Sequence, residues 1–174
     1  NFYAPLAYYF GGTINALGAD ALLSTKIMMI VGILLSGVFM YLLARELWGK
    51  IGGLVSSLFY MYAPYHAVDI YVRGDVAEFW AYAFIPLAFY GILKASDEKK
   101  WTYVVLGSLG YAGIILSHNL TAMMITPFLI LFILFLFFKK TKEKQTGVYY
   151  YPFLVLLIGI GLSAFYWLPA LFEL

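Results

Sequence analysis

The sequence predicts an all-α protein, a polytopic bundle of transmembrane helices, on three observations. Hydrophobic residues make up 64% of the 174 residues and charged residues only 11%, whereas soluble domains are about one-quarter charged. The apolar residues come in runs close to the roughly 20 residues that a helix needs to cross a bilayer. Aromatic residues reach 20%, as is typical of proteins with wide membrane interfaces. This composition argues against a soluble enzyme, a disordered segment and a nucleic-acid binder.

About six spans are predicted, and they are helices because lipid offers no partners for unpaired backbone groups. The second span is short because Pro64 ends it. The sixth is either one helix or two half-helices, since Gly159 and Gly161 lie within it. Residues 1–20 are expected to form an external loop segment, and residues 21–174 the bundle. The predicted spans are residues 21–44, 51–63, 76–93, 101–117, 120–138 and 148–168.

The basic residues predict the orientation of these spans, because cytoplasmic loops are enriched in Lys and Arg. All but Lys26 and Arg73 of the eleven basic residues fall in the loops after the first, third and fifth spans. We therefore expect a plasma-membrane protein whose Lys-rich loops are cytoplasmic and whose motif residues are extracytoplasmic. The residues assigned to the cytoplasmic loops are Arg45, Lys50, Lys94, Lys99, Lys100, Lys139, Lys140, Lys142 and Lys144.

The richest polar stretch joins the second and third spans and includes both acids and bases. If residues 66–73 are helical, His66 and Asp69 share a face, and Asp69 and Arg73 pair at i,i+4. Asp75 would lie near the N-cap of the third span, with Glu78 one turn further in. Two interpretations stay open, since Asp69–Arg73 is also a natural structural ion pair and Asp75 a plain helix cap. Ionisable groups at this depth are otherwise usually functional or paired.

Two further polar breaks are predicted on the same outer side. Ser117-His118-Asn119 separates two apolar runs, either as a tight hairpin turn or as a site whose histidine faces the same external cavity as Asp69 and Glu78. Tyr166 and Trp167 lie near the end of the chain, with Glu173 just beyond them. They form either an aromatic interface anchor or part of a substrate site.

Small residues predict where helices approach closely. Gly107, Gly110 and Gly113 recur every three residues in the fourth span. Gly53 and Ser57 belong to a similar group in the second. We interpret both groups as structural.

What the sequence lacks excludes further classes of function. There is no cysteine, which excludes disulfides, thiolate zinc sites and cysteine nucleophiles. No phosphate-binding glycine loop is present, so the segment itself contains no ATP-driven machinery. No Arg ladder of a voltage sensor is seen.

The order of the motifs resembles a family of bacterial and archaeal membrane proteins labelled "6-pyruvoyl-tetrahydropterin synthase-related domain; membrane protein". Its layout is similar to that of the GT-C superfamily of lipid-phosphate-sugar-dependent glycosyltransferases. Pterin synthesis itself is not expected, because the soluble enzymes use three zinc-binding histidines and a cysteine, and this chain has two histidines and no cysteine. The matching motifs are Phe2-Tyr-Ala-Pro-Leu-Ala-Tyr-Tyr9, Tyr65-His-Ala-Val-Asp-Ile-Tyr-Val-Arg-Gly-Asp-Val-Ala-Glu78, Pro86-Leu87, Ser117-His118 and Tyr166-Trp167-Leu-Pro169.

The resemblance to GT-C enzymes implies that a sugar is transferred from a polyprenyl phosphate on the outer face. It implies carboxylates in external loops that act as a base or as ligands of Mg²⁺ or Mn²⁺. It also implies a key acidic residue in the first long external loop. Because the chain starts at Asn1 rather than Met, we expect it to be a segment of a larger protein, and that acid to lie upstream.

The sequence therefore predicts a GT-C-like glycosyltransferase that uses a polyprenyl-phosphate-linked sugar. Non-catalytic lipid binding or transport by the same architecture is the alternative. Expected partners are the lipid-linked sugar, membrane lipid and the remainder of the longer chain, with no nucleic acid. The candidate catalytic residues are Asp69, Arg73, Asp75, Glu78 and His118. The candidate substrate-binding residues are His66, Tyr71, Tyr166, Trp167 and Glu173.

Overall fold

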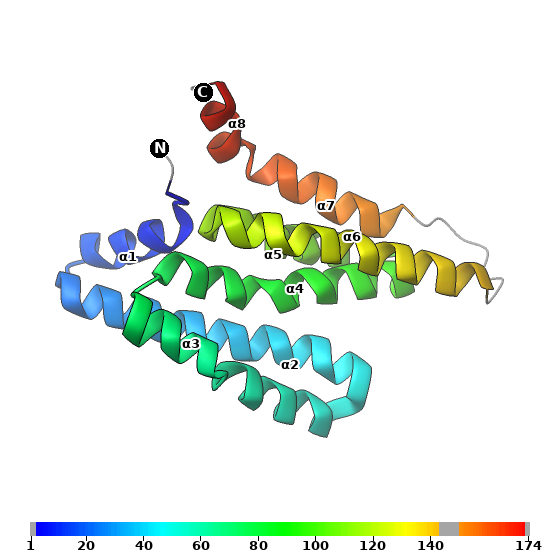
Figure 1. The fold of residues 1–174 in the computed structure, drawn as a ribbon, viewed down its shortest axis with the longest axis horizontal. Helices are drawn as coiled ribbons and strands as arrows, with labels where there is room; N and C mark the ends of the chain where they lie inside the picture. The colour runs from blue at the N-terminus through cyan, green and yellow to red at the C-terminus, as the bar shows by residue number, and fades with distance from the viewer. Residues whose placement is uncertain (1–2, 143–149, 173–174) are drawn as a thin grey trace.

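A computed structural model describes residues 3–142 and 150–172 of the chain, and every regular element in these ranges is a helix. The predicted all-α membrane bundle is confirmed, with the long helices running side by side (Figure 1). The elements are α1 (Leu6–Ala16), α2 (Ala21–Met61), α3 (Pro64–Val68), the π-helix η1 (Asp69–Arg73), α4 (Val76–Glu98), α5 (Trp101–Ser117), α6 (Asn119–Lys142), α7 (Tyr151–Leu162) and α8 (Ala164–Phe172).

The helix α2 is folded back on itself as a hairpin (Figure 1). The turn is at Gly49, whose φ of 73° and ψ of −176° lie in a region that is open mainly to glycine. The two arms then pack closely, and Ser57 Oγ donates to the Gly37 carbonyl at 2.8 Å. The turn falls between the predicted spans 21–44 and 51–63. The second arm ends at Met61, in agreement with the prediction that Pro64 ends this span, and a new helical stretch begins at Pro64 and runs through α3 and η1 to Arg73.

The helix α4 is the central element of the bundle. It contacts α2, α5, α6 and α7. In its most apolar stretch 72% of the residues are buried, against 28% in the corresponding stretches of α2 and α6. Lys99, in the left-handed conformation at a φ of 53°, ends the helix. The central position of α4 matters because its first turn forms part of the candidate site.

The glycines of α5 let it lie directly against α4. A Cβ built on Gly91 of α4 would stand 2.2 Å from the Gly107 Cα, and one on Gly110 would stand 2.6 Å from the Ala88 backbone nitrogen. Such separations leave no room for a side chain. The predicted close approach at Gly107 and Gly110 is therefore confirmed, and α4 is the neighbour.

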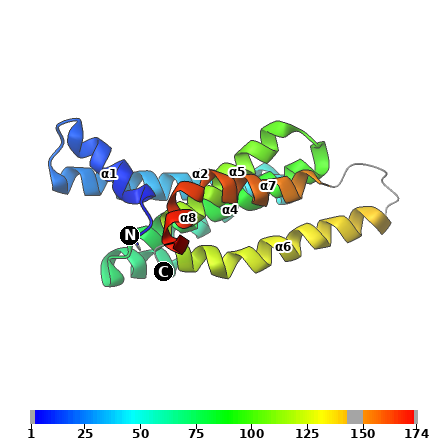
Figure 2. The same cartoon turned by 90° about the horizontal axis from the view of Figure 1, so that it is seen from above.

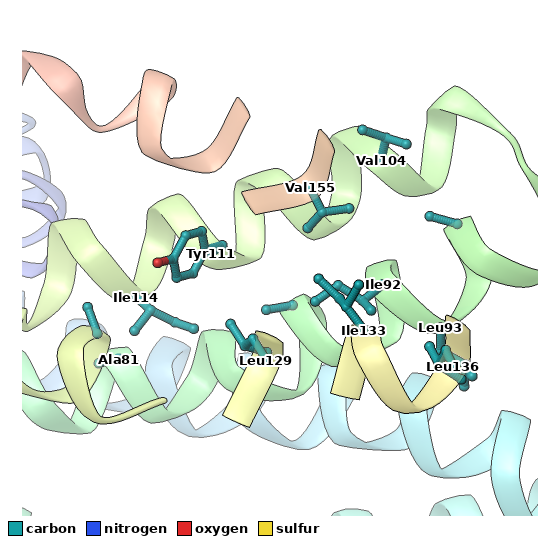
Figure 3. Close-up of a cluster of buried hydrophobic side chains, with 13 residues drawn as sticks. Ala81, Ile92, Leu93, Val104, Tyr111, Ile114, Leu129, Ile133, Leu136 and Val155 are labelled. Carbon is teal, nitrogen blue, oxygen red and sulfur yellow. The ribbon is translucent and has the colours of Figure 1, made fainter. Parts of the chain in front are cut away.

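One apolar core joins α4, α5, α6 and α7, and Figure 3 shows its side chains between the helices. Ile92, Val104, Ile114, Leu129 and Val155 are fully buried there. In Figure 2, α6 runs along one side of the bundle, apart from α4, α5 and α7 for much of its length. A second cluster around Phe79 and Trp80 holds α1 and α2 against α4.

The outer surfaces of the long helices remain apolar. Leu34, Leu58, Phe128 and Leu131 are more than half exposed, which suits lipid contact. Helices long and apolar enough to cross a membrane are Ala21–Arg73, Val76–Glu98 and Asn119–Thr141, and Trp101–Ser117 and Tyr151–Leu162 are shorter apolar helices. The predicted span 148–168 is divided, because α7 ends before Ser163 and α8 begins after it. Its first two residues lie outside the described ranges.

Ion pairs tie the helices together at the end away from residues 64–75. Lys94 Nζ lies 2.5 Å from Glu98 Oε1 and 3.2 Å from Glu46 Oε2, linking α4 to the turn region of α2. Glu98 also pairs with Lys100 at 2.7 Å. The Glu98 carboxylate raises the pKa of the Lys100 ammonium, which lies between α4 and α5. This end holds the loops predicted to be cytoplasmic.

The contact between α4 and α5 gives the first prediction. In the full-length protein, Gly91→Ala forces a methyl group against the Gly107 backbone, and overpacking of this kind costs about 1–3 kcal/mol or more. We expect a lower midpoint of thermal unfolding in detergent. Gly161→Ala is the matched control, since a Cβ there meets nothing within 4 Å. Equal midpoints for the two variants would contradict this packing.

Candidate functional site

The polar motifs of distant sequence regions meet at one end of the bundle. The start of α2, the end of η1, the first turn of α4, the junction of α5 with α6, and α8 all lie at this end in both views (Figures 1 and 2). The sequence predicted this gathering from the alternation of spans. The outer side of the membrane is the predicted location of this end.

Residues 64–78 reverse the chain between η1 and α4. Pro64 starts α3, and Gly74 adopts a φ of 64° that permits a tight reversal. The Asp75 N–H then donates to the Asp69 carbonyl at 3.0 Å. Asp75 Oδ1 accepts from the Glu78 N–H at 3.0 Å and so caps α4. The predicted N-cap role of Asp75 is confirmed.

Arg73 lies at the centre of an acid–arginine cluster, formed by Tyr65, Asp69, Arg73, Asp75 and Glu78. Its Nη1 stands 3.0 Å from Asp69 Oδ1 and 2.6 Å from Glu78 Oε2, and Nη2 stands 3.4 Å from Asp75 Oδ2. Nη1 also donates to Tyr65 Oη at 2.8 Å, and Tyr65 donates onward to Glu78 Oε1 at 2.9 Å. The predicted Asp69–Arg73 pair is present, within a larger network. One cation thus contacts three carboxylates.

The side chains of the cluster differ in how far they are exposed to solvent. Asp69 is 0% exposed, with Oδ2 unpartnered, and Glu78 is 8% exposed. Arg73 and Asp75 are more open, with side-chain exposures of 42% and 26%. The cluster therefore has a buried half that holds the reversal together and an open half that a ligand can approach.

The open half borders a cavity of about 480 Å³, here called the outer cavity. This volume is within the range of small-molecule sites. The cavity brings Arg73 and Asp75 together with His118, 45 positions after Arg73 in the chain. The sequence hypothesis expected His118 to share a cavity with Asp69 and Glu78, and these two are not among the described wall residues because they are buried behind Arg73. Its walls are formed by Tyr3, Ala4, Tyr8, Arg73, Gly74, Asp75, Val76, Ala77, Ser117, His118, Asn119 and Leu120.

His118 lies in the extended link between α5 and α6. Its Nδ1 is 2.8 Å from Thr121 Oγ1 and accepts the Thr121 N–H at 3.4 Å, which favours a proton on Nε2. Asn119 lies beside it and donates to Tyr166 Oη at 2.8 Å. Because Nδ1 is used, Nε2 is the ring atom left to meet a ligand.

Other predicted residues are placed away from the outer cavity. His66 is buried between the rings of Tyr60, Phe79 and Tyr82, with centroids 5.4, 5.7 and 5.8 Å away. Tyr71 is 85% exposed and lies outside the cavity walls.

The C-terminal aromatic residues lie at the edge of this region. Tyr166 reaches it through Asn119. Trp167 Nε1 donates to the Ile160 carbonyl of α7 at 3.0 Å. Glu173 lies outside the described residues, so its predicted role stays a prediction.

The expected Mg²⁺ or Mn²⁺ finds no ligand set among the described residues. No group of three His, Asp or Glu side chains there has the spacing to hold a metal ion. The carboxylates of the cluster face the Arg73 guanidinium, which occupies the position between them. The cluster residues in this arrangement do not fit a metal site.

Sequence reasoning missed several cavity residues. Tyr3 and Tyr8 belong to the aromatic motif near the N-terminus, which pointed to the family but not to the site. Ser117 and Asn119 flank His118, and the sequence analysis interpreted them as residues of a hairpin turn rather than as ligand-binding residues. Tyr65 precedes the predicted motif helix and bridges Arg73 and Glu78. The i,i+3 and i,i+4 spacings find partners within a helix, whereas these contacts form between helices.

A family model described as "6-pyruvoyl-tetrahydropterin synthase related domain; membrane protein" matches residues 1–173. The chain belongs to this family. It is also similar to a Lactococcus lactis subsp. cremoris protein described as uncharacterized, at 28% identity over 99% of the chain and 29% of that protein. The chain thus spans less than a third of the length of this relative. No solved structure matches.

Membership of this family identifies a membrane protein and confirms that part of the sequence prediction. A GT-C-like layout stays a prediction from the motifs, because no solved structure matches the chain.

The acid–arginine cluster yields a prediction about stability. Arg73→Ala leaves three carboxylates without their cation, and two of them, Asp69 and Glu78, are buried, where an uncompensated charge is destabilising. Asp69→Asn instead removes one of the repelling charges and keeps the side-chain shape. In the full-length protein we expect a clearly lower unfolding midpoint for Arg73→Ala than for Asp69→Asn. The reverse order would show that Arg73 does not hold this reversal together.

Proposed function

We propose that this family member transfers a sugar from a polyprenyl phosphate to an acceptor hydroxyl in the outer cavity. The observation that supports it is the joint presence of a carboxylate, a guanidinium and an imidazole in the walls of one cavity, from Asp75, Arg73 and His118. A donor carried by a membrane lipid needs no nucleotide-binding motif, and the sequence has none. The similarity of the motifs to GT-C enzymes supports the same reaction class.

In the proposed reaction Asp75 is the general base, because it is the carboxylate of the cluster that borders the cavity. Its Oδ2 takes the proton of the acceptor hydroxyl, and the acceptor oxygen forms a bond to the sugar C1. The bond between C1 and the phosphate oxygen breaks, and its electron pair leaves with the polyprenyl phosphate. Arg73 and the Nε2 proton of His118 stabilise the charge that develops on this phosphate.

The buried half of the cluster has a positioning role in this proposal. Asp69 and Glu78 bind Arg73 through Nη1. Nη2 then faces Asp75 and the cavity. This division assigns Asp69 and Glu78 to orientation of the guanidinium, and it reserves contact with substrate for Arg73, Asp75 and His118.

Non-catalytic lipid binding is the second candidate. The observation that favours it is the saturation of Arg73 by groups of the protein itself, three carboxylates and Tyr65. A network of this kind, which holds two helices together, is as consistent with a binding pocket as with a catalytic site. The two functions differ in whether the charge of Asp75 is required.

Asp75→Asn separates the two candidates. The amide oxygen retains the N-cap of α4 but loses the base, so transfer from radiolabelled polyprenyl-phosphate sugars should fall at least about 100-fold. The assay uses the full-length protein in membranes. The control is Asp20→Asn, since Asp20 caps α2 through a 2.7 Å bond from the Leu23 N–H and lies outside the cavity walls. Transfer at the wild-type rate by folded Asp75→Asn would contradict the transferase proposal.

The proposed reaction also requires the outer cavity to face the outside of the cell. The segment has no cysteine, so single cysteines can report the sidedness of the full-length protein once its other cysteines are replaced. With a membrane-impermeant maleimide on intact cells, Leu17→Cys should be labelled, since Leu17 is 84% exposed between α1 and α2. Lys99→Cys should be labelled only after permeabilisation. The opposite pattern would place the cavity in the cytoplasm.

A further inference from the structure

Three helices begin at the outer cavity. The N-terminal turns of α1, α4 and α6 each contribute wall residues, among them Tyr8, Ala77 and Leu120. The first N–H groups of a helix have no acceptor within that helix, and they carry its positive partial charge. The beginnings of these long helices therefore make the local potential of the cavity favourable for an anion.

Some of these N–H groups are already used and others are free. In α4 the Glu78 N–H donates to Asp75 Oδ1, whereas the Ala77 N–H has no protein acceptor among the described residues. In α6 the Thr121 N–H donates to His118 Nδ1. Over the same described ranges the Asn119 and Leu120 N–H groups find no acceptor in the protein. Free backbone donors from two helices thus border one space.

Ser117 supplies an independent observation at the same wall. It is the last residue of α5, it is 0% exposed, and its Oγ has no hydrogen-bond partner. Two other fully buried serines behave differently, since Ser108 Oγ donates to the Val155 carbonyl and Ser163 Oγ to the Gly159 carbonyl. A buried hydroxyl without a partner is an unsatisfied hydrogen-bond donor, and an acceptor atom of a bound ligand would satisfy it.

The charged side chains among the described wall residues are Arg73 and Asp75. Asp75 Oδ1 accepts from the Glu78 N–H, and Oδ2 faces Arg73 Nη2. Its contact with Arg73 Nη2, at 3.4 Å, is longer than the Nη1 contacts of 3.0 and 2.6 Å. Nη2 is therefore the part of the guanidinium most easily turned toward a ligand.

We propose that the outer cavity contains a phosphate subsite built from the N-termini of α4 and α6, the Ser117 hydroxyl and Nη2 of Arg73. The helix N–H groups and the hydroxyl donate to the phosphate oxygens, and the guanidinium balances their charge. The choice of a lipid-borne phosphate rests on the proposed function, whereas the anion chemistry rests on the wall residues alone.

The test measures binding of farnesyl phosphate to the full-length protein in nanodiscs by titration calorimetry. Farnesol is the uncharged control, and inorganic pyrophosphate is the soluble anion. No sugar is present, so the result does not depend on transfer. We expect farnesyl phosphate to bind at least about tenfold more tightly than farnesol, as charge-assisted hydrogen bonds to the phosphate imply.

Two variants test the subsite without removing Arg73. Ser117→Ala deletes the free hydroxyl, and Ser108→Ala is its matched control on the same helix. Asn119→Asp places a negative charge at the start of α6, which favours the helix but repels a phosphate. We expect Ser117→Ala and Asn119→Asp each to weaken farnesyl phosphate binding about tenfold. Ser108→Ala should bind as the wild type does. The unfolding midpoint of Asn119→Asp should not fall.

Each outcome has a distinct meaning. Equal affinities for farnesyl phosphate and farnesol, or wild-type affinity in both Ser117→Ala and Asn119→Asp, overturn the subsite. Pyrophosphate that binds as tightly as farnesyl phosphate supports the subsite and overturns the lipid as its source. Phosphate binding without sugar transfer leaves the subsite standing and removes the transferase. Transfer with an unchanged KM in Ser117→Ala removes the subsite and leaves the transferase.

Discussion

The arrangement of the outer end depends on a single cation held among three carboxylates. Arg73 contacts Asp69, Asp75 and Glu78, which come from the start of η1 and the beginning of α4. Without its charge the acids would repel one another where the chain reverses at Gly74. This reversal determines where α4 starts. The helices α2, α5, α6 and α7 all pack against α4. The electrostatic joint and the packing of the bundle are therefore coupled.

The sequence predicted those features that depend on local spacing. The runs of apolar residues placed the helices, the i,i+4 spacing paired Asp69 with Arg73, and the glycines of α5 marked a close contact. Each of these follows from the periodicity of one helix. The sequence also predicted that the second arm ends before Pro64, and α2 does end at Met61, after which the chain continues as α3 and η1 to Arg73. A proline disrupts one turn of a helix, but the next turn can begin at the proline itself.

The outer cavity could not be predicted in the same way. Its walls come from α1, the η1–α4 reversal and the α5–α6 junction, so its shape depends on how helices far apart in the chain pack. The sequence assigned equal importance to Asp69, Asp75 and Glu78 because all three are acids in one motif. Burial distinguishes them, since Asp69 and Glu78 face inward while Asp75 borders the cavity. Spacing along a helix does not report which residues the next helix covers.

The position of the cavity follows from the direction of the helices. An up-and-down bundle alternates the polarity of its helices, so helix N-termini and C-termini share each end. At the outer end, α4 and α6 start beside the cavity, and α5 finishes there with the unpartnered Ser117 hydroxyl. Asp75 and His118 cap the two starting helices through single atoms. Because these bonds to backbone N–H groups fix the two side chains, they also fix the positions of the remaining atoms, Asp75 Oδ2 and His118 Nε2. The same residues that begin the helices are positioned to meet a ligand, which ties the proposed chemistry to the fold.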